Sequence, residues 1–471
     1  MKQYFGIFAA ILLLAGCNDT IPEDEGGQSG TSSSNIWIYK QMKNYYLWSD
    51  EMPAESNGYF SYSPEIYFES LLYKRGQVLG DRFSYITSTS TSSKATAPDT
   101  PDAADTYVTD FGFYGRIANV VNNSSGINFS AYQILYVIPD SPADVKGIMR
   151  GDLFRKINGQ QVSTNNISTY LGYSDITLTQ CDYSGNTSGT VQISKGSYAN
   201  NPLIAAMMIG VGNYNIAYMA YNHFSFGKNY VFTEILKECF KFFKENEANE
   251  LVLDLRFNPG GYINVAALLA TMIVGRDHTD NGDVLCYQEY NTTYGNYLKG
   301  VLGSTYDQTP FGSSMLSSEE MDECCLDLDR VHIITQSRTA SASELVLHAL
   351  KPYIEVIQYG QTTSGKNLGA VNISGESSNV PWEINPIVSR VSDRNRLSGY
   401  ESGISPSARL TASDLGMGDL GDLNNENLLN LVWANIDGRV PASVFSEGEE
   451  FTIETLYEPS LKGGGIILEN L

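Results

Sequence analysis

The pattern of hydrophobic and polar residues changes its period along the chain of 471 residues. Residues 36–48 place apolar side chains at helical spacing, and a second helical run follows Ser63. From Tyr107 onward, short alternating runs such as residues 134–138 predict β-strands joined by tight turns. From about residue 213, apolar strand-like runs alternate with amphipathic helical runs, which predicts a parallel sheet with right-handed crossovers.

These changes predict a mixed α/β protein of several domains. The segment from Arg276 to Asp329 is long, polar and rich in tyrosine, so we interpret it as an insertion that forms a lid or a wall beside a substrate. The expected units are a leader at residues 1–17, a flexible tether at 18–34, a helical N-terminal domain at 35–95, a β-domain at 104–200, an α/β core at 201–440 and a C-terminal segment at 441–471.

The first residues have the composition of an export signal. Lys2 precedes an apolar run at residues 4–15, which is too short to span a bilayer. The run ends in Leu14-Ala15-Gly16-Cys17, which resembles a bacterial lipobox. The resemblance implies that Cys17 becomes the lipidated N-terminus, anchored to the outer membrane on its periplasmic or its cell-surface face. The alternative is an ordinary signal peptide in which the cysteine is incidental.

Composition and charge argue against several partners and cofactors. The net charge is −23 and no basic stripe offsets the acidic residues, so we expect no nucleic-acid partner. Apart from Cys17 the chain has five cysteines, an odd number without a CxxC pair, and its four histidines are far apart. We therefore expect no disulfide framework, no metal site and no cofactor. The adjacent Cys324 and Cys325, close to acidic residues, are the remaining candidates for a metal or redox role.

Residues 141–159 (SPADVKGIMRGDLFRKING) combine a short helix, a turn, a strand and an Asn-Gly hairpin turn. This order resembles a PDZ domain. The resemblance implies that the loop Phe111-Gly112-Phe113-Tyr114-Gly115 binds the C-terminal carboxylate of a peptide, while the peptide adds a strand to the open sheet edge. The alternative is a small β-domain that only packs against the rest of the protein.

Three loops of the α/β region follow strands of the predicted parallel sheet, at residues 258–261, 337–341 and 361–369. Because the carboxyl ends of parallel strands lie at one edge, side chains from these loops can meet there. Gly260 and Gly261 precede a helix, where backbone N–H groups can approach a negative oxygen closely. This arrangement suits an oxyanion hole, and it suits a phosphate site or a simple tight turn equally well.

Ser341 begins a nearly all-apolar helix, with Glu344 three residues further on. This spacing is typical of a capping box, which is a sufficient structural reason for the serine. The alternative is a nucleophile at the sheet edge, with Ala342 N–H pointing at a developing oxyanion. Lys366 lies on a Gly-rich turn, where a lysine is ordinarily a surface charge. As a general base it would need burial, because only the neutral amine accepts the serine proton.

Three segments resemble those of the C-terminal-processing, or tail-specific, serine peptidases. They are LVLDLRFNPGG (251–261), TASASEL (339–345) and TTSGKNLG (362–369). The N-terminal pattern YYLW…DRFSYI is similar to the helical cap of Bacteroidetes-type lipoprotein members of this family. Residues 399–410 are similar to a run that closes the family's core.

The resemblance implies an endopeptidase with a Ser–Lys dyad formed by Ser341 and Lys366. The oxyanion is then held by the amide of Ala342 and an amide of Gly260 or Gly261. The implied substrates are exported or unfolded proteins, recognised at their C-termini through the PDZ domain, and no cofactor takes part. A lysine base predicts that activity rises with pH.

One position departs from the family pattern. Members carry a glutamine four residues after the lysine, which orients it, and here that position is Ala370. Gln361 or a backbone carbonyl is then expected to position Lys366. Some relatives use Ser–His–Glu, for which His223 is the candidate, and Ser343 is the alternative nucleophile.

The missing glutamine also favours a rival hypothesis, a catalytically inactive, PDZ-containing lipoprotein that binds peptides. A third hypothesis is a purely structural lipoprotein, which leaves the coincidence of the three loops unexplained. The sequence indicates neither the physiological substrate nor the oligomeric state.

Overall fold

The computed structural model describes residues 29–55, 61–89, 106–123, 126–312, 315–407, 418–423, 425–438, 451–458 and 466–467. The predicted leader with Cys17 lies outside the described residues. A helix, α1 (Ser29–Tyr45), opens the described part, so regular structure begins earlier than the predicted domain boundary at residue 35. Within the described ranges, no helix combines the length and the apolar content that a membrane span requires.

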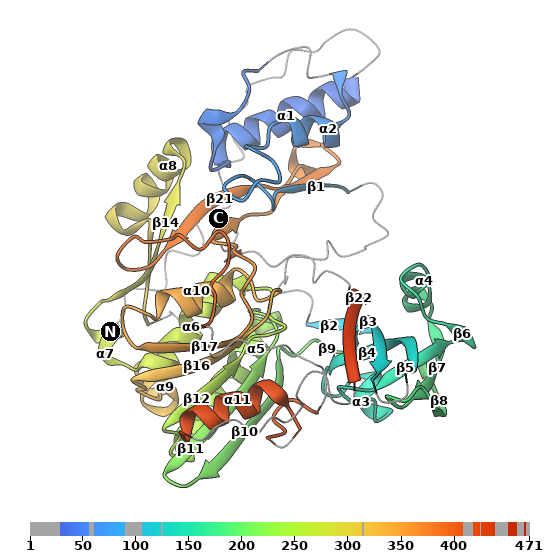
Figure 1. Ribbon diagram of the computed structural model, residues 1–471. Helices are drawn as coiled ribbons and strands as arrows, with labels where there is room; N and C mark the ends of the chain where they lie inside the picture. Colours follow the sequence, from blue (N-terminus) through green and yellow to red (C-terminus); the bar gives the residue numbers. More distant parts are fainter. Residues whose placement is uncertain are drawn as a thin grey trace.

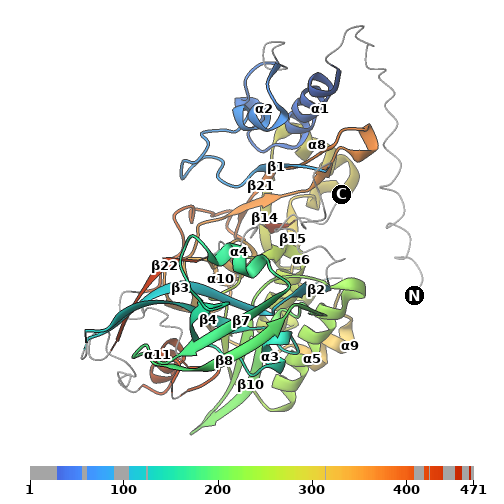
Figure 2. The same ribbon diagram turned by 90° about the vertical axis from the view of Figure 1, so that its right-hand side faces the viewer.

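Short helices and one strand complete the N-terminal unit: η2 (Ser49–Glu51), α2 (Pro64–Ser70) and β1 (Tyr85–Ser88). Buried Tyr46 and Tyr67 pack in one cluster with Leu368 from the core. β1 pairs with β20 (Trp382–Asn385), which also pairs with β19 (Ile373–Ser374). The unit therefore shares a sheet with a distant part of the chain, and it lies at the opposite end of the molecule from α11 (Figures 1 and 2).

The β-domain has one sheet with the order β22-β3-β4-β5-β7-β8, to which β6 adds beside β5, and a separate pair of β2 with β9. Its elements are β2 (Tyr107–Asp110), β3 (Phe113–Asn122), β4 (Asn128–Val137), α3 (Pro142–Val145), β5 (Leu153–Ile157), β6 (Gln160–Gln161), α4 (Ile167–Gly172), β7 (Asp175–Cys181), β8 (Thr187–Ser194), β9 (Gly196–Ala199) and β22 (Phe451–Tyr457). Ile117, Tyr132 and Phe154 lie in its core.

The core sheet has the order β10-β11-β12-β16-β17, with an antiparallel first pair and parallel pairs after it. Its elements are β10 (Leu203–Val211), β11 (Tyr214–Tyr221), η4 (Lys228–Tyr230), α5 (Val231–Glu245), β12 (Glu250–Asp254), α6 (Ile263–Val274), β16 (Arg330–Thr335), α10 (Ala342–Ala349), β17 (Glu355–Gly360) and α11 (Asn427–Ile436). Leu251 and Leu253 of β12 face one core cluster and Val252 the other. The mixed α/β fold with parallel crossovers is confirmed.

A second sheet has the order β13-β23-β18-β21-β14-β15. Its strands are β13 (Gly261–Tyr262), β14 (Val284–Tyr290), β15 (Gln308–Pro310), β18 (Leu368–Ala370), β21 (Ile387–Ser392) and β23 (Ile466–Ile467). The predicted insertion at residues 276–329 supplies β14 and β15, together with α7 (Asp277–Asp280), α8 (Thr292–Leu302), η5 (Gly303–Thr305) and α9 (Ser318–Cys324). Because β14 pairs with β21, the segment is a built-in part of this sheet rather than a separate lid.

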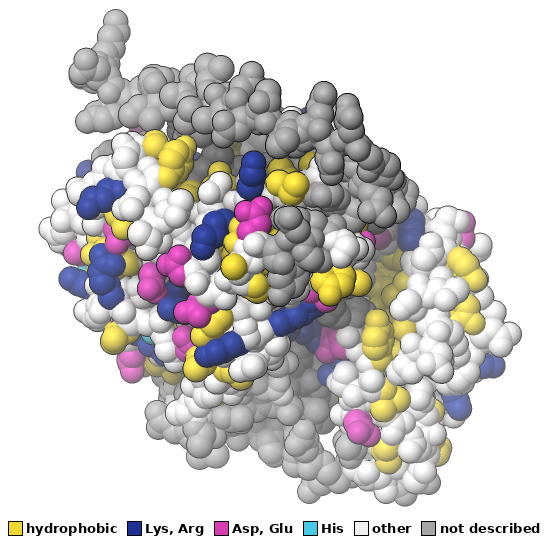
Figure 3. Space-filling view, turned by 90° about the horizontal axis from the view of Figure 1, so that it is seen from above, with side chains coloured by type: hydrophobic (Ala, Val, Ile, Leu, Met, Phe, Trp, Pro, Cys, Tyr) yellow, Lys and Arg dark blue, Asp and Glu magenta, His cyan; other side chains and the backbone are white. Residues whose placement is uncertain are grey.

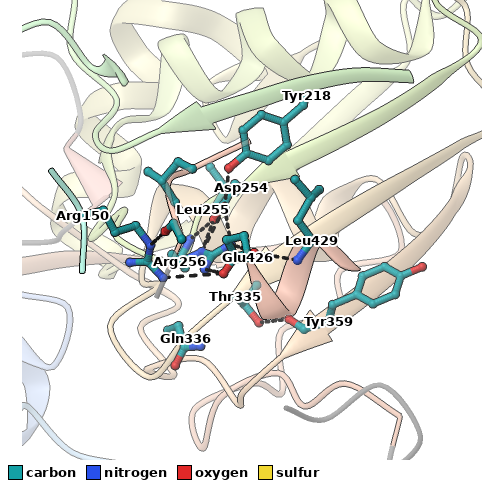
Figure 4. A network of polar contacts seen from close by, with 12 residues as sticks. Arg150, Tyr218, Asp254, Leu255, Arg256, Thr335, Gln336, Tyr359, Glu426 and Leu429 are labelled. Atoms are coloured by element: carbon teal, nitrogen blue, oxygen red, sulfur yellow. Dashed lines mark hydrogen bonds and ion pairs between the residues drawn. The ribbon is translucent and has the colours of Figure 1, made fainter. Parts of the chain in front are cut away.

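A buried network of charges connects the β-domain, the core sheet and α11 (Figure 4). The Arg256 guanidinium donates to Asp254 Oδ2 at 2.6 Å and to Glu426 Oε1 at 2.6 Å. Arg150 lies 3.6 Å from the same Glu426 oxygen and donates to Leu135 O at 2.7 Å. Since these charged side chains are almost completely buried, removal of one leaves an uncompensated charge in the interior.

One face of the molecule carries side chains of mixed chemistry. On the face seen from above, basic, acidic and hydrophobic side chains are interspersed (Figure 3).

The cysteines in the described part of the chain are buried and form no disulfide: Cys181, Cys239, Cys286, Cys324 and Cys325. Burial raises the pKa of the Cys239, Cys286 and Cys325 thiols to about 12, so these thiols are unreactive at neutral pH.

Candidate active site

The three loops that follow β12, β16 and β17 lie side by side at the carboxyl edge of the core sheet. Ala340 N–H donates to Asn258 O at 3.2 Å, and Ser364 N–H donates to Thr339 O at 2.9 Å. Thr339 Oγ1 also donates to Leu255 O at 2.8 Å. These bonds join the three loops into one unit, as the parallel topology requires.

Ser341 is the N-cap residue of α10 and is completely buried. Its φ of 60° and ψ of −116° are unusual for a residue with a side chain, so the surrounding structure must hold this strained conformation. Ser341 and Glu344 have the arrangement of a capping box, but the bond that forms is the one from Ser341 N–H to Glu344 Oε2, at 2.8 Å. Ser341 Oγ has no hydrogen-bond partner among the described residues, so the hydroxyl is not used as a cap.

Gly260 lies directly against this serine. A Cβ atom at Gly260 would be 2.7 Å from Ser341 Cβ and 3.0 Å from both Ser341 Oγ and Ala342 N, so only glycine fits. The Gly260 N–H donates to Asn258 Oδ1 at 2.8 Å, and Asn258 Nδ2 donates to Tyr221 O at 2.9 Å. The structure thus brings Gly260, Ser341 and Ala342 together, while the N–H of Gly260 is bonded inside its own loop.

Gly261 begins β13 and faces a different neighbour. Phe224 N–H donates to Gly260 O at 2.9 Å, and Tyr262 N–H donates to Phe224 O at 2.9 Å. Because consecutive residues of a strand direct their backbone groups to opposite sides, the N–H and C=O of Gly261 face β23. Of the two glycines, Gly261 is therefore the one whose N–H points toward β23, the neighbouring strand of the second sheet.

Glu344 connects the nucleophile loop with the lysine loop. Its Oε2 accepts from Ser341 N–H and from Lys366 N–H, both at 2.8 Å. Its Oε1 accepts from Gly365 N–H at 2.6 Å and from Thr363 Oγ1 at 2.5 Å. Burial raises the pKa of this carboxyl, and the converging donors oppose that effect. One carboxylate oxygen thus places the backbones of Ser341 and Lys366 within two hydrogen-bond lengths of each other.

Lys366 is 7% exposed and follows a sharp turn at Gly365. Its Nζ lies 4.7 Å from the ring centre of Phe83, which belongs to the N-terminal unit. The neighbouring Arg82 donates to Gly365 O at 3.1 Å and to Glu401 O at 3.0 Å. The N-terminal unit therefore supplies both a ring beside the lysine and a clamp on its loop.

Position 370, where a glutamine was expected, lies at the end of β18. Ala370 packs with the apolar cluster that joins the N-terminal unit to the core, which includes Ile384. A polar side chain would be costly in that cluster. Gln361 N–H donates to Thr335 O at 2.9 Å, and Thr335 Oγ1 donates to Gln361 O at 2.7 Å. Gln361 thus anchors the start of the lysine loop through its backbone.

The two alternative catalytic residues have other contacts. His223 Nδ1 lies 2.6 Å from Asn222 Oδ1, so its neighbour is an amide rather than a carboxylate. Burial lowers the pKa of His223 to about 4. Ser343 lies inside α10, and its Oγ donates to Asn258 O at 3.1 Å, which ties the helix to the glycine loop.

The predicted peptide-binding loop connects β2 to β3. Gly112 N–H donates to Asp110 Oδ1 at 2.7 Å, while Phe111 stacks on Phe113 with ring centres 5.6 Å apart. Tyr114 stacks on Tyr136 at 5.4 Å, and Gly115 packs closely against β4. The β3 edge that follows this loop is covered by β22.

Sequence reasoning missed three contributions to this region. Glu344 was expected only as a capping residue, although a lone acid in an apolar helix is a signal for a further role. Arg82 and Phe83 were noted only as part of a family-like pattern. The short β23, between β13 and β18, has no hydrophobic period that sequence analysis could use.

The fold and these loops define a protein with a serine-hydrolase type of site. Residues 33–85 match the family model of the peptidase S41 N-terminal domain, and residues 215–380 match peptidase family S41. Over these two stretches the chain is therefore similar to the S41 peptidases, the family of C-terminal-processing peptidases.

Curated C-terminal-processing peptidases are similar to this chain at low sequence identity. The chain is 25% identical over 244 residues to a carboxyl-terminal-processing protease of Picosynechococcus, covering 50% of this chain and 51% of the relative. It is 24% identical over 243 residues to the chloroplastic carboxyl-terminal-processing peptidase 1 of Arabidopsis thaliana, covering 50% and 44%. The chain thus spans about half the length of the curated relatives it matches.

Among solved structures, one assigned to the S41 proteases, from Bacteroides fragilis, has a similar fold. The TM-score is 0.68 at 23% sequence identity, and the match covers 86% of this chain and 97% of that one. The similarity therefore extends over the N-terminal unit, the β-domain and the core.

Proposed function

We propose that this chain is a lipid-anchored serine endopeptidase of the C-terminal-processing type, which cleaves exported or unfolded proteins with Ser341 and Lys366. The observation that carries the proposal is the environment of Ser341. Its hydroxyl is buried, unpaired within the described residues and held in a strained conformation at a helix N-terminus, beside Gly260. The loop of Lys366 is bonded to the carboxylate that also holds Ser341.

The proposed reaction has two steps. Lys366 Nζ, in its neutral form, takes the proton of Ser341 Oγ, and the oxygen attacks the scissile carbonyl carbon. The resulting oxyanion accepts hydrogen bonds from the amide of Ala342 and the amide of a glycine at 260–261. The charged lysine then protonates the leaving amine as the C–N bond breaks. The neutral lysine then takes a proton from water, the hydroxide attacks the acyl carbon, and the charged lysine returns the proton to Ser341 Oγ as the ester C–O bond breaks.

Within the glycine pair, the geometry favours Gly261 as the donor. The N–H of Gly260 already donates to Asn258 Oδ1, whereas the backbone groups of Gly261 face the strand position occupied by β23. A substrate strand in that position would pair with Gly261 as β23 does. Gly260 then serves the site by its lack of a side chain, which lets Ser341 approach.

A fluorophosphonate label with mass mapping tests the nucleophile. We expect one label on Ser341, and no label and no cleavage of an unfolded protein such as reduced casein in the Ser341→Ala variant. A label on Ser343, or cleavage by Ser341→Ala, would refute the proposed nucleophile. Ser337→Ala, on the same loop, is the matched control.

The pH dependence separates lysine from histidine as the base. With Lys366 as base, the rate should rise through the alkaline range, since only the neutral amine accepts a proton. With His223, whose pKa is lowered to about 4, the rate should already be constant above about pH 6. Activity that survives Lys366→Ala and disappears in His223→Gln would overturn the assignment.

Anchoring through Cys17 and peptide recognition by the β-domain are further parts of the proposal. We expect Cys17→Ser to release the protein from the membrane fraction, and a wild-type N-terminal peptide to carry the mass of a lipid. Retention of Cys17→Ser on the membrane would contradict lipid anchoring.

The rival is a catalytically inactive peptide-binding lipoprotein, and Ala370 favours it. Ala370 packs among apolar side chains and cannot form a hydrogen bond through its own side chain. Nothing at this position therefore orients Lys366 in the way that the family's glutamine does. This rival predicts that peptides bind while Ser341 stays unlabelled, which the labelling experiment decides directly.

A further inference from the structure

The open edge of the β-domain is occupied by the chain's own β22. This strand pairs antiparallel with β3, from Phe451 opposite Asn122 to Tyr457 opposite Ile117. The C-terminal end of β22 therefore points toward the loop at residues 111–115, which begins β3. A peptide with its carboxylate at that loop would have to run in the same direction along the same edge.

Side chains add to this backbone pairing. Arg116 Nη1 donates to Thr455 Oγ1 at 2.9 Å, and Tyr457 packs against the β-domain core. Glu454, Thr455 and Leu456 are exposed, whereas Ile453 and Tyr457 on either side of them are half-buried. In Figure 1, β22 lies on the side of the β-domain that faces the core.

The residue after β22 contacts the nucleophile loop. Glu458 forms an ion pair with Arg338, which shortly precedes Ser341. The Arg338 guanidinium also lies 5.3 Å from the ring centre of Tyr114 in the predicted peptide loop and 5.6 Å from that of Phe257. The end of β22 therefore lies beside the loop that leads to Ser341.

Further along, β23 takes a strand position at that site. It pairs in parallel with β13 on one side and with β18 on the other, and Ile466 is opposite both Gly261 and Gly369. β13 carries the glycine whose amide faces β23, and β18 begins just after Lys366. A strand in this position lies between the two loops that the reaction needs.

We propose that β22 and β23 are internal ligands of the peptide-binding surface and that substrates enter by displacing them. Two separate observations carry the proposal, the pairing of β22 with β3 and the pairing of β23 between β13 and β18. The effect on catalysis rests on the proposed function: if the chain is a peptidase, its own strands occupy the peptide-binding surface until a substrate displaces them. We call this the self-occupied state. The occupation of the edge itself is measured by binding, without turnover.

Competition with a tethered strand sets the expected size of the effect. A strand of the same chain competes with a free peptide at an effective concentration on the order of millimolar. A free peptide of the same sequence therefore binds the intact chain with an apparent Kd on the order of millimolar. If the segment is released and the peptide binds with a Kd below about 0.1 mM, its apparent affinity rises at least about ten-fold.

A disulfide between Asn119→Cys and Glu454→Cys locks β22 in place. These residues are opposite each other in the antiparallel pair, where Cα atoms are about 4.5–5.5 Å apart, a separation that a disulfide spans. Asn119 is half-buried and Glu454 is exposed, so neither is a core position. The buried native thiols have raised pKa values and compete poorly for the bond.

A proline pair, Ile453→Pro and Glu454→Pro, releases β22. Consecutive residues point their N–H groups to opposite sides, so one of the two prolines must remove a bond to β3. Ile453→Val with Glu454→Gln is the matched control, which keeps both N–H groups.

The experiment measures the fluorescence anisotropy of a labelled FTIETLYE peptide, the sequence of residues 451–458, on full-length chains that carry Ser341→Ala. We expect no binding by the oxidised, locked chain, weak binding after reduction, and binding at least about ten-fold tighter by the proline variant than by its control. Equal binding by the locked and reduced chains, or no binding by any chain, would overturn the proposal. If the proline variant does not fold, the locked and reduced pair still decides.

The same chains with Ser341 intact separate the two proposals. Casein cleavage that falls on oxidation and recovers on reduction supports both. If the peptide binds as expected but no chain cleaves casein, the proposed function is refuted and the self-occupied state is not. If all chains cleave casein and bind the peptide equally, the self-occupied state is refuted and the proposed function is not.

Discussion

Replacement of Glu344 by glutamine tests whether one carboxylate holds the nucleophile and the lysine together. Glutamine keeps the shape of the side chain but replaces one acceptor oxygen by an NH2 group, which can only donate. In one orientation the NH2 faces the N–H groups of Ser341 and Lys366, and in the other it faces the donors of Gly365 and Thr363. Two buried donors lose their acceptor in either case.

The magnitude follows from these bonds. A buried donor without a partner costs about 1–3 kcal/mol, so we expect the free energy of unfolding to fall by about 2–6 kcal/mol. Displacement of Ser341 or Lys366 by about 1 Å lowers the rate of a positioned reaction about 100-fold. The fluorophosphonate labelling rate of Ser341 should decrease by that order.

Urea unfolding and labelling rates measure the two effects on the same samples. Glu238→Gln, at an exposed position of α5, is the control and should change stability by no more than about 0.5 kcal/mol. If Glu344→Gln matches the control in both assays, the carboxylate does not organise the site and the reasoning fails.

Four further predictions concern other contacts. Gly260→Ala places a Cβ against Ser341, so labelling of Ser341 should nearly disappear, while circular dichroism shows a folded protein. Phe83→Ala removes the ring beside the lysine and should lower casein cleavage more than Phe83→Tyr does; equal rates would exclude a role for the ring. Glu426→Ala leaves Asp254 as the one carboxylate for Arg150 and Arg256, so one buried positive charge is uncompensated. We expect the free energy of unfolding in urea to fall by about 3–5 kcal/mol, and a change under about 1 kcal/mol would contradict this expectation. His223 has a folded pKa of about 4 against its usual 6.5, so the native state binds fewer protons than the unfolded state in this range, and stability is lost as pH falls from 6.5 to 4. His223→Gln should flatten that dependence, which amounts to at most about 3 kcal/mol by denaturation at several pH values.

The core could be predicted from the sequence because its signals are local and strong. Apolar runs of strand and helix length fixed β12, α6 and β16, and the parallel order follows from their alternation. That order alone brings the loops of Gly260, Ser341 and Lys366 to one edge. The β5 strand at 153–157 was also predicted, since turn residues delimit it on both sides.

Features that depend on long-range pairing could not be predicted. The segment at 276–329 is polar, yet β14 is an interior strand of the second sheet because it pairs with β21, about a hundred residues away. The helical N-terminal domain was expected as a separate unit, whereas β1 pairs with β20 and Phe83 reaches Lys366. Pairings of this kind leave no periodic trace in either partner's sequence, so only the folded chain reveals them.

The pairing of β1 with β20 also bears on when this site can form during synthesis. Tyr85 is opposite Asn385, and Arg82 bonds the backbone at Gly365, so the contacts that clamp the lysine loop join parts of the chain almost three hundred residues apart. Domains generally fold as the chain emerges from its N-terminus, but this unit cannot reach its place until nearly the whole chain has been made. The site is therefore completed late, only after nearly the whole chain has been made. The order of folding itself keeps the lysine loop unclamped while the chain is still being synthesised.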